Sequence, residues 1–230
     1  MKPHSEEVKK QSMRSLEIEK KKSSMKLTDT QRETLVGLLL GDAHLETQNN
    51  GRTYRVKLEY GVKQREYLEH LYELFKEWTL SPPRTKSDST HNNICFQTVS
   101  HAAFRFYAHQ FYDERRKRVP ANIHRFLTPR AIAYWFMDDG SIKSKDSKGV
   151  IFNTQCFERG DIARLVEALR RDFNLEAKER KQPEGWQIYI SGKSYERFRE
   201  IVDPYIIESM RYKIPTERKS VLTNNTMPKE

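Results

Sequence analysis

Two apolar segments that lie 97 residues apart, each ending in an acidic residue, constrain the fold of this chain more than any other feature. The first covers 35–42 and ends at Asp42, and the second covers 131–139 and ends at Asp139. Each follows a threonine suited to capping a helix N-terminus. Because both segments are apolar on nearly every side, they predict two buried helices. The two acids then occupy equivalent positions in two similar halves.

Other features recur at nearly the same offset. Lys117 and Pro120 are echoed by Lys213 and Pro215, which are displaced by 96 and 95 positions. No period of 20–50 residues accompanies them, as it would in a solenoid. The pattern therefore indicates a single duplication.

The segments between these landmarks predict the same elements in both halves. Residues 53–60 alternate polar and apolar, which is typical of a half-buried antiparallel strand, and Asn49-Asn50-Gly51 supplies a hairpin turn before it. The fold class is therefore α+β, with two pseudo-symmetric αββαββα halves that carry antiparallel β-ribbons around a central helix pair. Further strands are predicted at 94–98, 150–154 and 186–190, and helices at 67–75, 101–112, 162–173 and 194–210.

The two repeated sets of residues also suggest where the subdomains begin and end. We expect subdomains at 28–125 and 126–222, a basic N-terminal arm at 1–27 and a short tail at 223–230. The charge run at 20–24 is more typical of a solvated arm. The alternative is a strap that contacts phosphate groups.

Charge and composition narrow the classes of function. Lys and Arg total 42 against 32 Asp and Glu, so the net charge is +10 and the pI is about 9.5. This balance favours a polyanionic partner, above all nucleic acid. No segment approaches the roughly 20 apolar residues of a membrane span, and we expect no secretory signal. Cys95 and Cys156 lack the spacing of a zinc site or a disulfide framework.

The two acids predict a metal site. Small residues would let the two helices approach closely, and Asp42 and Asp139 would then meet. Two adjacent carboxylates raise each other's pKa unless a cation lies between them, and oxygen ligands suit Mg²⁺. For either motif alone, a helix cap or turn is the simpler interpretation; the repetition favours the paired site. The small residues are Gly37, Gly41, Ala131 and Ala133.

The two segments resemble a known signature. Residues 35–43 (LVGLLLGDA) and 132–140 (IAYWFMDDG) are similar to the paired motifs of LAGLIDADG homing endonucleases. Gly140 keeps the glycine that ends the signature, whereas Ala43 replaces it in the first motif. The strings at 80–83 (LSPP), 153–155 (NTQ) and 212–215 (YKIP) resemble the omega-intron members of the family, which are encoded in mitochondrial large-subunit rRNA genes.

This resemblance implies an activity. It implies a monomeric, site-specific endonuclease that hydrolyses both strands of double-stranded DNA across the minor groove and leaves short 3′ overhangs. The implied cofactor is Mg²⁺, for which Mn²⁺ substitutes. It further implies an intron-encoded protein of a mitochondrion or chloroplast, whose cleavage promotes intron mobility.

The resemblance also assigns metal ligands. The acidic ligands of the family fall on Asp42 and Asp139, which are the implied catalytic acids. The backbone carbonyls of Gly41 and Asp138 are expected to complete the metal shell.

Further catalytic positions fall on two lysines. Lys117 and Lys213 match the basic residues that the family places beside each scissile phosphate, where an ammonium group stabilises charge in the transition state or orients the attacking water. Taken singly, each is an ordinary surface lysine. Glu59 and Asn153 match auxiliary polar positions near the metals.

The ribbons are expected to recognise the DNA, because an antiparallel ribbon fits the major groove. The sequence does not separate residues that contact bases from those that contact phosphates. The alternative function is an RNA-binding intron maturase on the same fold, with intron RNA as partner; the presence of both acids and both lysines favours the nuclease. The expected DNA-binding residues are Thr53, Arg55, Lys57, Arg84, Lys86, Lys143, Lys145, Lys148, Lys178, Arg180 and Lys181.

Overall fold

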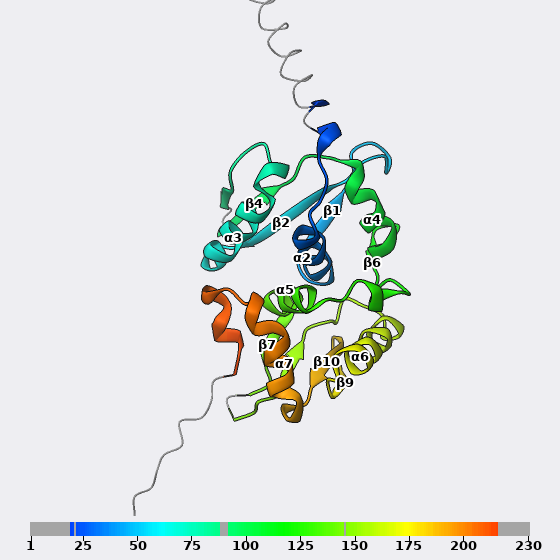
Figure 1. The fold of residues 1–230 in the computed structure, drawn as a ribbon, viewed down its shortest axis with the longest axis vertical. Coiled ribbons are helices and arrows are strands. Elements are labelled where there is room, and N and C mark those ends of the chain that lie inside the picture. The colour runs from blue at the N-terminus through cyan, green and yellow to red at the C-terminus, as the bar shows by residue number, and fades with distance from the viewer. Residues whose placement is uncertain (1–18, 21, 88–91, 145, 216–230) are drawn as a thin grey trace, which may run out of the picture.

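The computed structural model describes residues 19–20, 22–87, 92–144 and 146–215. Its two halves lie one above the other along the long axis of the molecule (Figure 1). Helices α2 (Asp29–Leu40) and α5 (Pro129–Asp139) pack against each other where the halves meet.

The first half follows the predicted order. Its sheet is antiparallel with strand order β1-β2-β4-β3, and β2 sends Val56, Leu58 and Tyr60 into the core. A turn with positive φ at Asn50 and Gly51 joins β1 to β2, as the sequence predicts. After α2 the elements are β1 (His44–Glu46), β2 (Arg55–Gly61), α3 (Arg65–Phe75), β3 (Arg84–Ser87), β4 (Asn92–Gln97) and α4 (Arg105–Phe111).

The second half repeats this arrangement, with strand order β7-β8-β10-β9. Phe152 of β8 contacts the rings of Trp135 and Phe136, so the sheet packs directly on α5. The predicted α+β fold of two like halves is therefore confirmed. After α5 the elements are β7 (Gly140–Ile142), β8 (Val150–Phe152), α6 (Arg159–Phe173), β9 (Ala177–Gln182), β10 (Gly185–Ile190) and α7 (Tyr195–Val202).

The helix interface depends on small residues, as predicted. A Cβ added at Gly37 would overlap the Ala131 carbonyl and the Tyr134 side chain, and one added at Gly41 would overlap the Asp138 carboxyl group. Burial of the large apolar side chains around this interface stabilises the fold by roughly 1.5–3 kcal/mol each. Those fully buried on α2 and α5 include Leu35, Leu38, Ile132, Trp135 and Phe136.

Local chemistry fixes the start of each central helix. Thr28 and Gln31 form a capping box, in which the Thr28 hydroxyl accepts from the Gln31 amide (3.2 Å) and the Gln31 side chain accepts from the Thr28 amide (3.0 Å). In α5 the Thr128 hydroxyl accepts from the Ala131 amide (3.2 Å), and Pro129 occupies the first turn.

Several predicted boundaries were wrong. The helix predicted at 194–210 ends at Val202 and continues as 3₁₀ turns, because Pro204 has no amide hydrogen for a helical bond. Strand β8 ends at Phe152, before the predicted limit at 154, and β4 ends at Gln97. A two-strand hairpin of β5 (Tyr112–Asp113) and β6 (Arg116–Lys117) was not predicted.

The proposed subdomain limits remain predictions. The end of the arm that the structure describes is not wholly solvated, because the His101 ring lies 2.9 Å from the Lys22 carbonyl oxygen. Residues 1–18, residue 21 and the predicted tail at 223–230 lie outside the described residues. Among the described helices, none has the length and apolar character to cross a membrane.

Candidate active site and nucleic-acid interface

Asp42 and Asp139 lie at the ends of the two central helices. Each interacts electrostatically with charged groups of the other half. Burial raises the pKa of Asp139 to about 7; the charge of Asp42 raises it too, while Lys117 and Lys213 lower it. Asp42 keeps contact with solvent, yet burial also raises its pKa against the effect of the same two lysines. The structure therefore brings together the two acids and two lysines that the sequence singled out.

The two lysines reach the helix ends in equivalent ways. Lys117 Nζ donates to the Gly41 carbonyl oxygen at 2.5 Å. Lys213 Nζ donates to the carbonyl oxygens of Asp138 (2.7 Å) and Met137 (2.5 Å). Burial lowers the pKa of both ammonium groups, while the neighbouring acids raise it.

Lys117 owes its place to the unpredicted hairpin. It stands on β6, where it pairs with Tyr112 of β5, and the hairpin follows α4 directly. Lys213 instead ends a 3₁₀ segment at Glu208–Lys213. Two different local structures thus deliver the same side chain to matching positions.

A third acid, Asp138, is buried, and its side chain has contacts that the sequence did not predict. Its Oδ1 accepts hydrogen bonds from the hydroxyls of Tyr60 (2.9 Å) and Tyr67 (2.8 Å), and its Oδ2 accepts from the Asp42 amide (2.9 Å). Burial first, and then the charge of Asp42, raise its pKa well above the ordinary value. The sequence predicts a role only for the backbone carbonyl of Asp138, as a metal ligand. The second acid in Asp-Asp-Gly is the sequence feature that could have pointed to its side chain.

The donors at this site fit a hard divalent cation. The carboxylates of Asp42 and Asp139 and the carbonyls of Gly41 and Asp138 offer only oxygen, as Mg²⁺ prefers. Each carbonyl has a second lone pair beside the one that accepts from lysine. Among the described residues, no three His, Cys, Asp or Glu side chains are grouped to hold a metal. A metal here therefore depends on two carboxylates and the backbone.

The two auxiliary residues have different surroundings. The backbone and side-chain amides of Asn153 donate to the Asp139 carbonyl oxygen at 2.9 and 2.8 Å, which places Asn153 directly beside an acid. Glu59 is instead bound within the first sheet, by Lys86 (2.8 Å) and Asn93 (3.1 Å). An auxiliary catalytic role remains a prediction for both.

The outer face of the first sheet carries most of the predicted DNA-binding residues of this half. Side chains alternate along each strand, and the strand register aligns the polar members of all four strands opposite the core. Arg55 is held by Glu46 at 2.9 Å, and the Thr53 hydroxyl accepts from Asn49 (2.9 Å) in the adjoining turn. This face comprises His44, Glu46, Arg55, Lys57, Glu59, Arg84, Lys86, Asn93 and Gln97.

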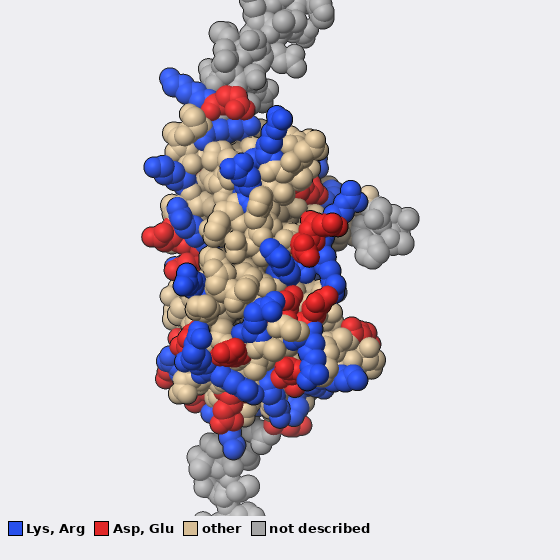
Figure 2. Space-filling model, turned by 90° about the vertical axis from the view of Figure 1, so that its right-hand side faces the viewer, with Lys and Arg blue, Asp and Glu red and all other residues tan. Residues whose placement is uncertain are grey.

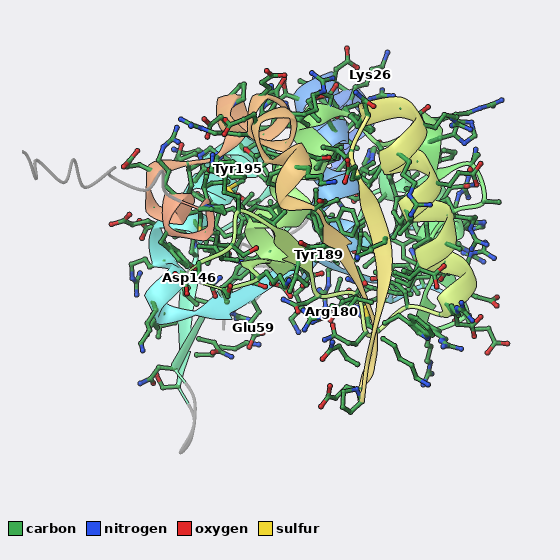
Figure 3. The ribbon with its side chains drawn as sticks, turned by 90° about the horizontal axis from the view of Figure 1, so that it is seen from below. Lys26, Glu59, Asp146, Arg180, Tyr189 and Tyr195 are labelled. Atoms are coloured by element: carbon green, nitrogen blue, oxygen red, sulfur yellow. The ribbon has the colours of Figure 1, made fainter. Side chains whose placement is uncertain are left out.

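The second sheet presents a smaller basic face. Lys178 pairs with Tyr189 across β9 and β10, and Arg180 pairs with Gln187. The ammonium groups of Lys143 and Lys178 lie 5.1 and 5.2 Å from the Tyr189 ring centroid, within the range of cation–π attraction. Both hairpins, β3–β4 and β9–β10, project from the same side of the molecule (Figure 3).

Three residues that were predicted to bind DNA are not among those found on these two outer sheet faces. Lys148 pairs with Glu196 of α7 at 2.8 Å, and Lys181 shares the opposite face of β9 with Glu179, which binds Arg159 of α6. Lys145 lies outside the described residues. On the face that Figure 2 displays, Lys and Arg are interspersed with Asp and Glu and do not form one continuous block.

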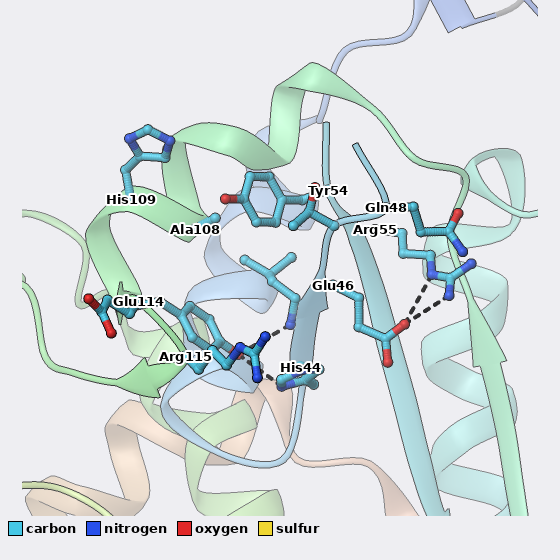
Figure 4. A pocket seen from close by; sticks show the side chains of 12 residues that line it. His44, Glu46, Gln48, Tyr54, Arg55, Ala108, His109, Glu114 and Arg115 are labelled. Atoms are coloured by element: carbon cyan, nitrogen blue, oxygen red, sulfur yellow. Dashed lines mark hydrogen bonds and ion pairs between the residues drawn. The ribbon is translucent and has the colours of Figure 1, made fainter. Parts of the chain in front are cut away.

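A cavity of about 770 Å³ adjoins β1 in the first half (Figure 4). It has charged side chains of both signs along its walls, with Arg55 and Arg115 among the basic ones and Glu46 and Glu114 among the acidic ones. His44, two residues after Asp42, also lines it, and burial lowers the pKa of this imidazole. The cavity therefore lies at the edge of the first sheet, between β1 and α4, and neither Asp42 nor Asp139 is among its lining residues.

Comparison with known proteins identifies the arrangement. The profile of the LAGLIDADG DNA endonuclease family matches residues 32–198, which include most of α2, all of α5 and both Asp42 and Asp139. The chain belongs to this family. Helices α2 and α5 are its LAGLIDADG helices, and the predicted resemblance is confirmed.

Individual relatives are similar to this chain over most of its length. "Probable intron-encoded endonuclease 1" of Wickerhamomyces canadensis is 32% identical over 204 residues, covering 84% of this chain and 87% of its own length. DNA endonuclease I-ChuI of Chlamydomonas applanata is 32% identical over 218 residues, covering 86% of this chain and 100% of its own. The solved structure of homing endonuclease I-WcaI bound to its DNA recognition sequence superposes with a TM-score of 0.82 at 30% identity, covering 87% and 93% of the two chains.

A relative of different description is also similar. Cytochrome b mRNA maturase bI2 of Saccharomyces cerevisiae is 29% identical over 197 residues, which cover 78% of this chain and 46% of the maturase.

Proposed function

We propose that this LAGLIDADG chain is a homing endonuclease that hydrolyses both strands of a specific DNA duplex with Mg²⁺ as cofactor and leaves short 3′ overhangs. The observation that carries the proposal is that Lys117 and Lys213 donate to the carbonyls of Gly41 and Asp138, the residues that precede Asp42 and Asp139, where α2 and α5 pack together. The similarity to a homing endonuclease bound to its DNA recognition sequence supports a duplex as substrate.

The proposed chemistry assigns a role to each of these residues. The carboxylates of Asp42 and Asp139, with the carbonyls of Gly41 and Asp138, would hold the divalent cation. When bound, such a cation stabilises the attacking and leaving oxygens of an in-line displacement. The Lys117 and Lys213 ammonium groups supply fixed positive charge for the phosphate and orient the attacking water. Two nearly equivalent sets account for cleavage of two strands by one chain, which we propose acts as a monomer.

The two outer sheet faces would provide the recognition surface. Arg, Lys and Asn donors and Glu acceptors can all read base edges in the major groove. The ion pairs Arg55–Glu46 and Lys86–Glu59 hold these side chains in defined orientations. Ion pairs at the protein surface add little stability, so the value of these two pairs in this proposal is positional.

Cleavage-site mapping with a randomised duplex library tests the proposal. Wild-type protein with Mg²⁺ should select one long target and cut both strands with a 3′ stagger. Asp42→Asn and Asp139→Asn proteins should retain binding of the selected target without making a double-strand break in it. Failure of the wild type to select and cut any duplex would contradict the nuclease proposal.

The second candidate function is that of an intron maturase, and the similarity to cytochrome b mRNA maturase bI2 is the observation that favours it. The basic sheet faces could bind RNA as well as DNA. Incubating the protein with its own intron transcript separates the two functions. A maturase accelerates splicing with Asp42→Asn as well as with the wild type, whereas a nuclease that is no maturase accelerates splicing with neither protein.

The biological setting follows as part of the proposal. A relative is described as intron-encoded, and cleavage of an intronless allele would promote copying of the intron into it. We propose that the host intron lies in an organellar gene and that the protein acts in that mitochondrion or chloroplast.

A further inference from the structure

The two LAGLIDADG helices end differently although both carry the family signature. Helix α5 runs through Asp139, so this acid is still part of the helix. Helix α2 ends at Leu40, and Gly41 leaves the helical conformation with φ −98° and ψ −127°. The two acids therefore have unequal backbone support.

The Asp138 carboxyl group accepts the hydrogen bond that the Asp42 amide donates just after the end of α2. The flanking amides of Gly41 and Ala43 bond to the carbonyls of Gly37 (3.0 Å) and Leu38 (2.8 Å), whereas the Asp42 amide donates to Asp138 Oδ2 at 2.9 Å. A side chain from the second half thus fixes the backbone of the acid in the first half.

The interface has room for only one such carboxylate. Gly41, just after α2, is the counterpart of Asp138 in α5, and a Cβ at Gly41 would overlap the Asp138 carboxyl group. The carboxylate itself is held from its other oxygen by the Tyr60 and Tyr67 hydroxyls of the first half. The pseudo-twofold symmetry is therefore broken at this pair.

We propose that Asp138 is a positioning residue for Asp42 and that it makes the two halves of the cleavage centre depend on different supports. Asp139 is held by its own helix and by Asn153, and Asp42 by Asp138 across the interface. This inference rests on the proposed nuclease function. Loss of Asp138 should then slow cleavage of one strand more than of the other, because a displacement near 1 Å of a reacting group can cost roughly 100-fold in rate.

The positional part is tested in the free protein, without metal or DNA, by hydrogen exchange of backbone amides followed by NMR. In Asp138→Ala the Asp42 amide should exchange at least about 10-fold faster relative to the Asn153 amide, which bonds to Asp139. Asp138→Asn keeps an acceptor oxygen and should restore protection. An Asp42 amide that is equally protected in wild type and Asp138→Ala would overturn the proposal.

The catalytic part is tested by single-turnover cleavage of the mapped target with each strand labelled. Asp138→Ala should cut one strand about 10-fold or more slower than the other and accumulate nicked duplex, and Asp138→Asn should recover most of the slow step. The matched control is Leu165→Ala, which opens a cavity at a fully buried residue of α6, a helix that packs on β9 and β10.

The outcomes separate the two levels of the proposal. Equal slowing of both strands by Asp138→Ala, or the same nicking in Leu165→Ala, would overturn the positioning role. A wild-type protein that cuts neither strand would instead overturn the proposed function, while the exchange experiment would still decide whether Asp138 holds Asp42.

Discussion

Lys117 Nζ lies 2.5 Å from the carbonyl oxygen of Gly41, the residue before one proposed catalytic acid, and Lys213 makes the equivalent contact to Asp138 before the other. Each lysine thus stands at a helix end and not on an open surface. Because of this position, replacing either lysine is expected to affect the cleavage rate more than the affinity for DNA.

Replacing either lysine should impair hydrolysis more than binding. We expect Lys117→Ala and Lys213→Ala to lower the single-turnover cleavage rate by roughly 100-fold, the range for loss of one stabilising donor, and to change target affinity by less than about 10-fold. Rates come from quenched-flow cleavage and affinities from gel shift in Ca²⁺. Normal cleavage by both variants would remove the proposed role.

The basic faces predict a salt-dependent affinity. Each phosphate that the protein neutralises contributes a slope of about −0.9 to log K against log salt. Arg180→Ala and Lys178→Ala should each make the slope shallower by about 1 if their contact is to phosphate. Lys148→Ala is the matched control, because the structure pairs this lysine with Glu196 of α7; a larger effect there would contradict the assignment of faces.

The helix interface predicts a steric effect on stability. Gly37→Ala should lower the free energy of unfolding by about 1–3 kcal/mol, since the added methyl group overlaps the Ala131 carbonyl. Gly160→Ala is the control, because the nearest atom to its Cβ is 4.0 Å away on the Arg164 side chain. Urea denaturation of both variants provides the comparison. Equal free energies of unfolding for the two variants would show that α2 and α5 can move apart without loss of stability.

The raised pKa of Asp139 predicts a pH dependence of stability in the metal-free protein. The folded carboxyl titrates at about 7 and the unfolded one near 3.8. This group's contribution is complete below the unfolded value and is lost as pH rises through the folded value. Asp139→Asn should remove that loss, which is roughly 2–4 kcal/mol for wild type. Denaturation midpoints of the two proteins between pH 5 and 8 measure the difference, and parallel curves would contradict it.

Much of the arrangement could be predicted from the chain because duplication supplies an internal comparison. The acids at 42 and 139 and the lysines at 117 and 213 were found by their shared offset. The last helix is shorter than predicted, because apolar residues continue past Val202 whereas Pro204 ends the helical hydrogen bonding.

The role of Asp138 could not be predicted in the same way. Successive helix side chains differ by about 100° in direction, so Asp138 and Asp139 face different surroundings, and only packing decides which acid is enclosed. The partners of Asp138 come from Tyr60 and Tyr67, far away in the sequence. The two faces of β9 likewise became distinct only when the register of Lys178 and Lys181 against β10 was known.

The most direct test of the central claim is strand cleavage by Asp42→Asn and Asp139→Asn proteins on the mapped duplex with Mg²⁺. The account predicts that each variant still binds the target but makes no double-strand break at a measurable rate. Full cleavage of both strands by either variant would show that the acids at the ends of the paired helices are not the catalytic centre.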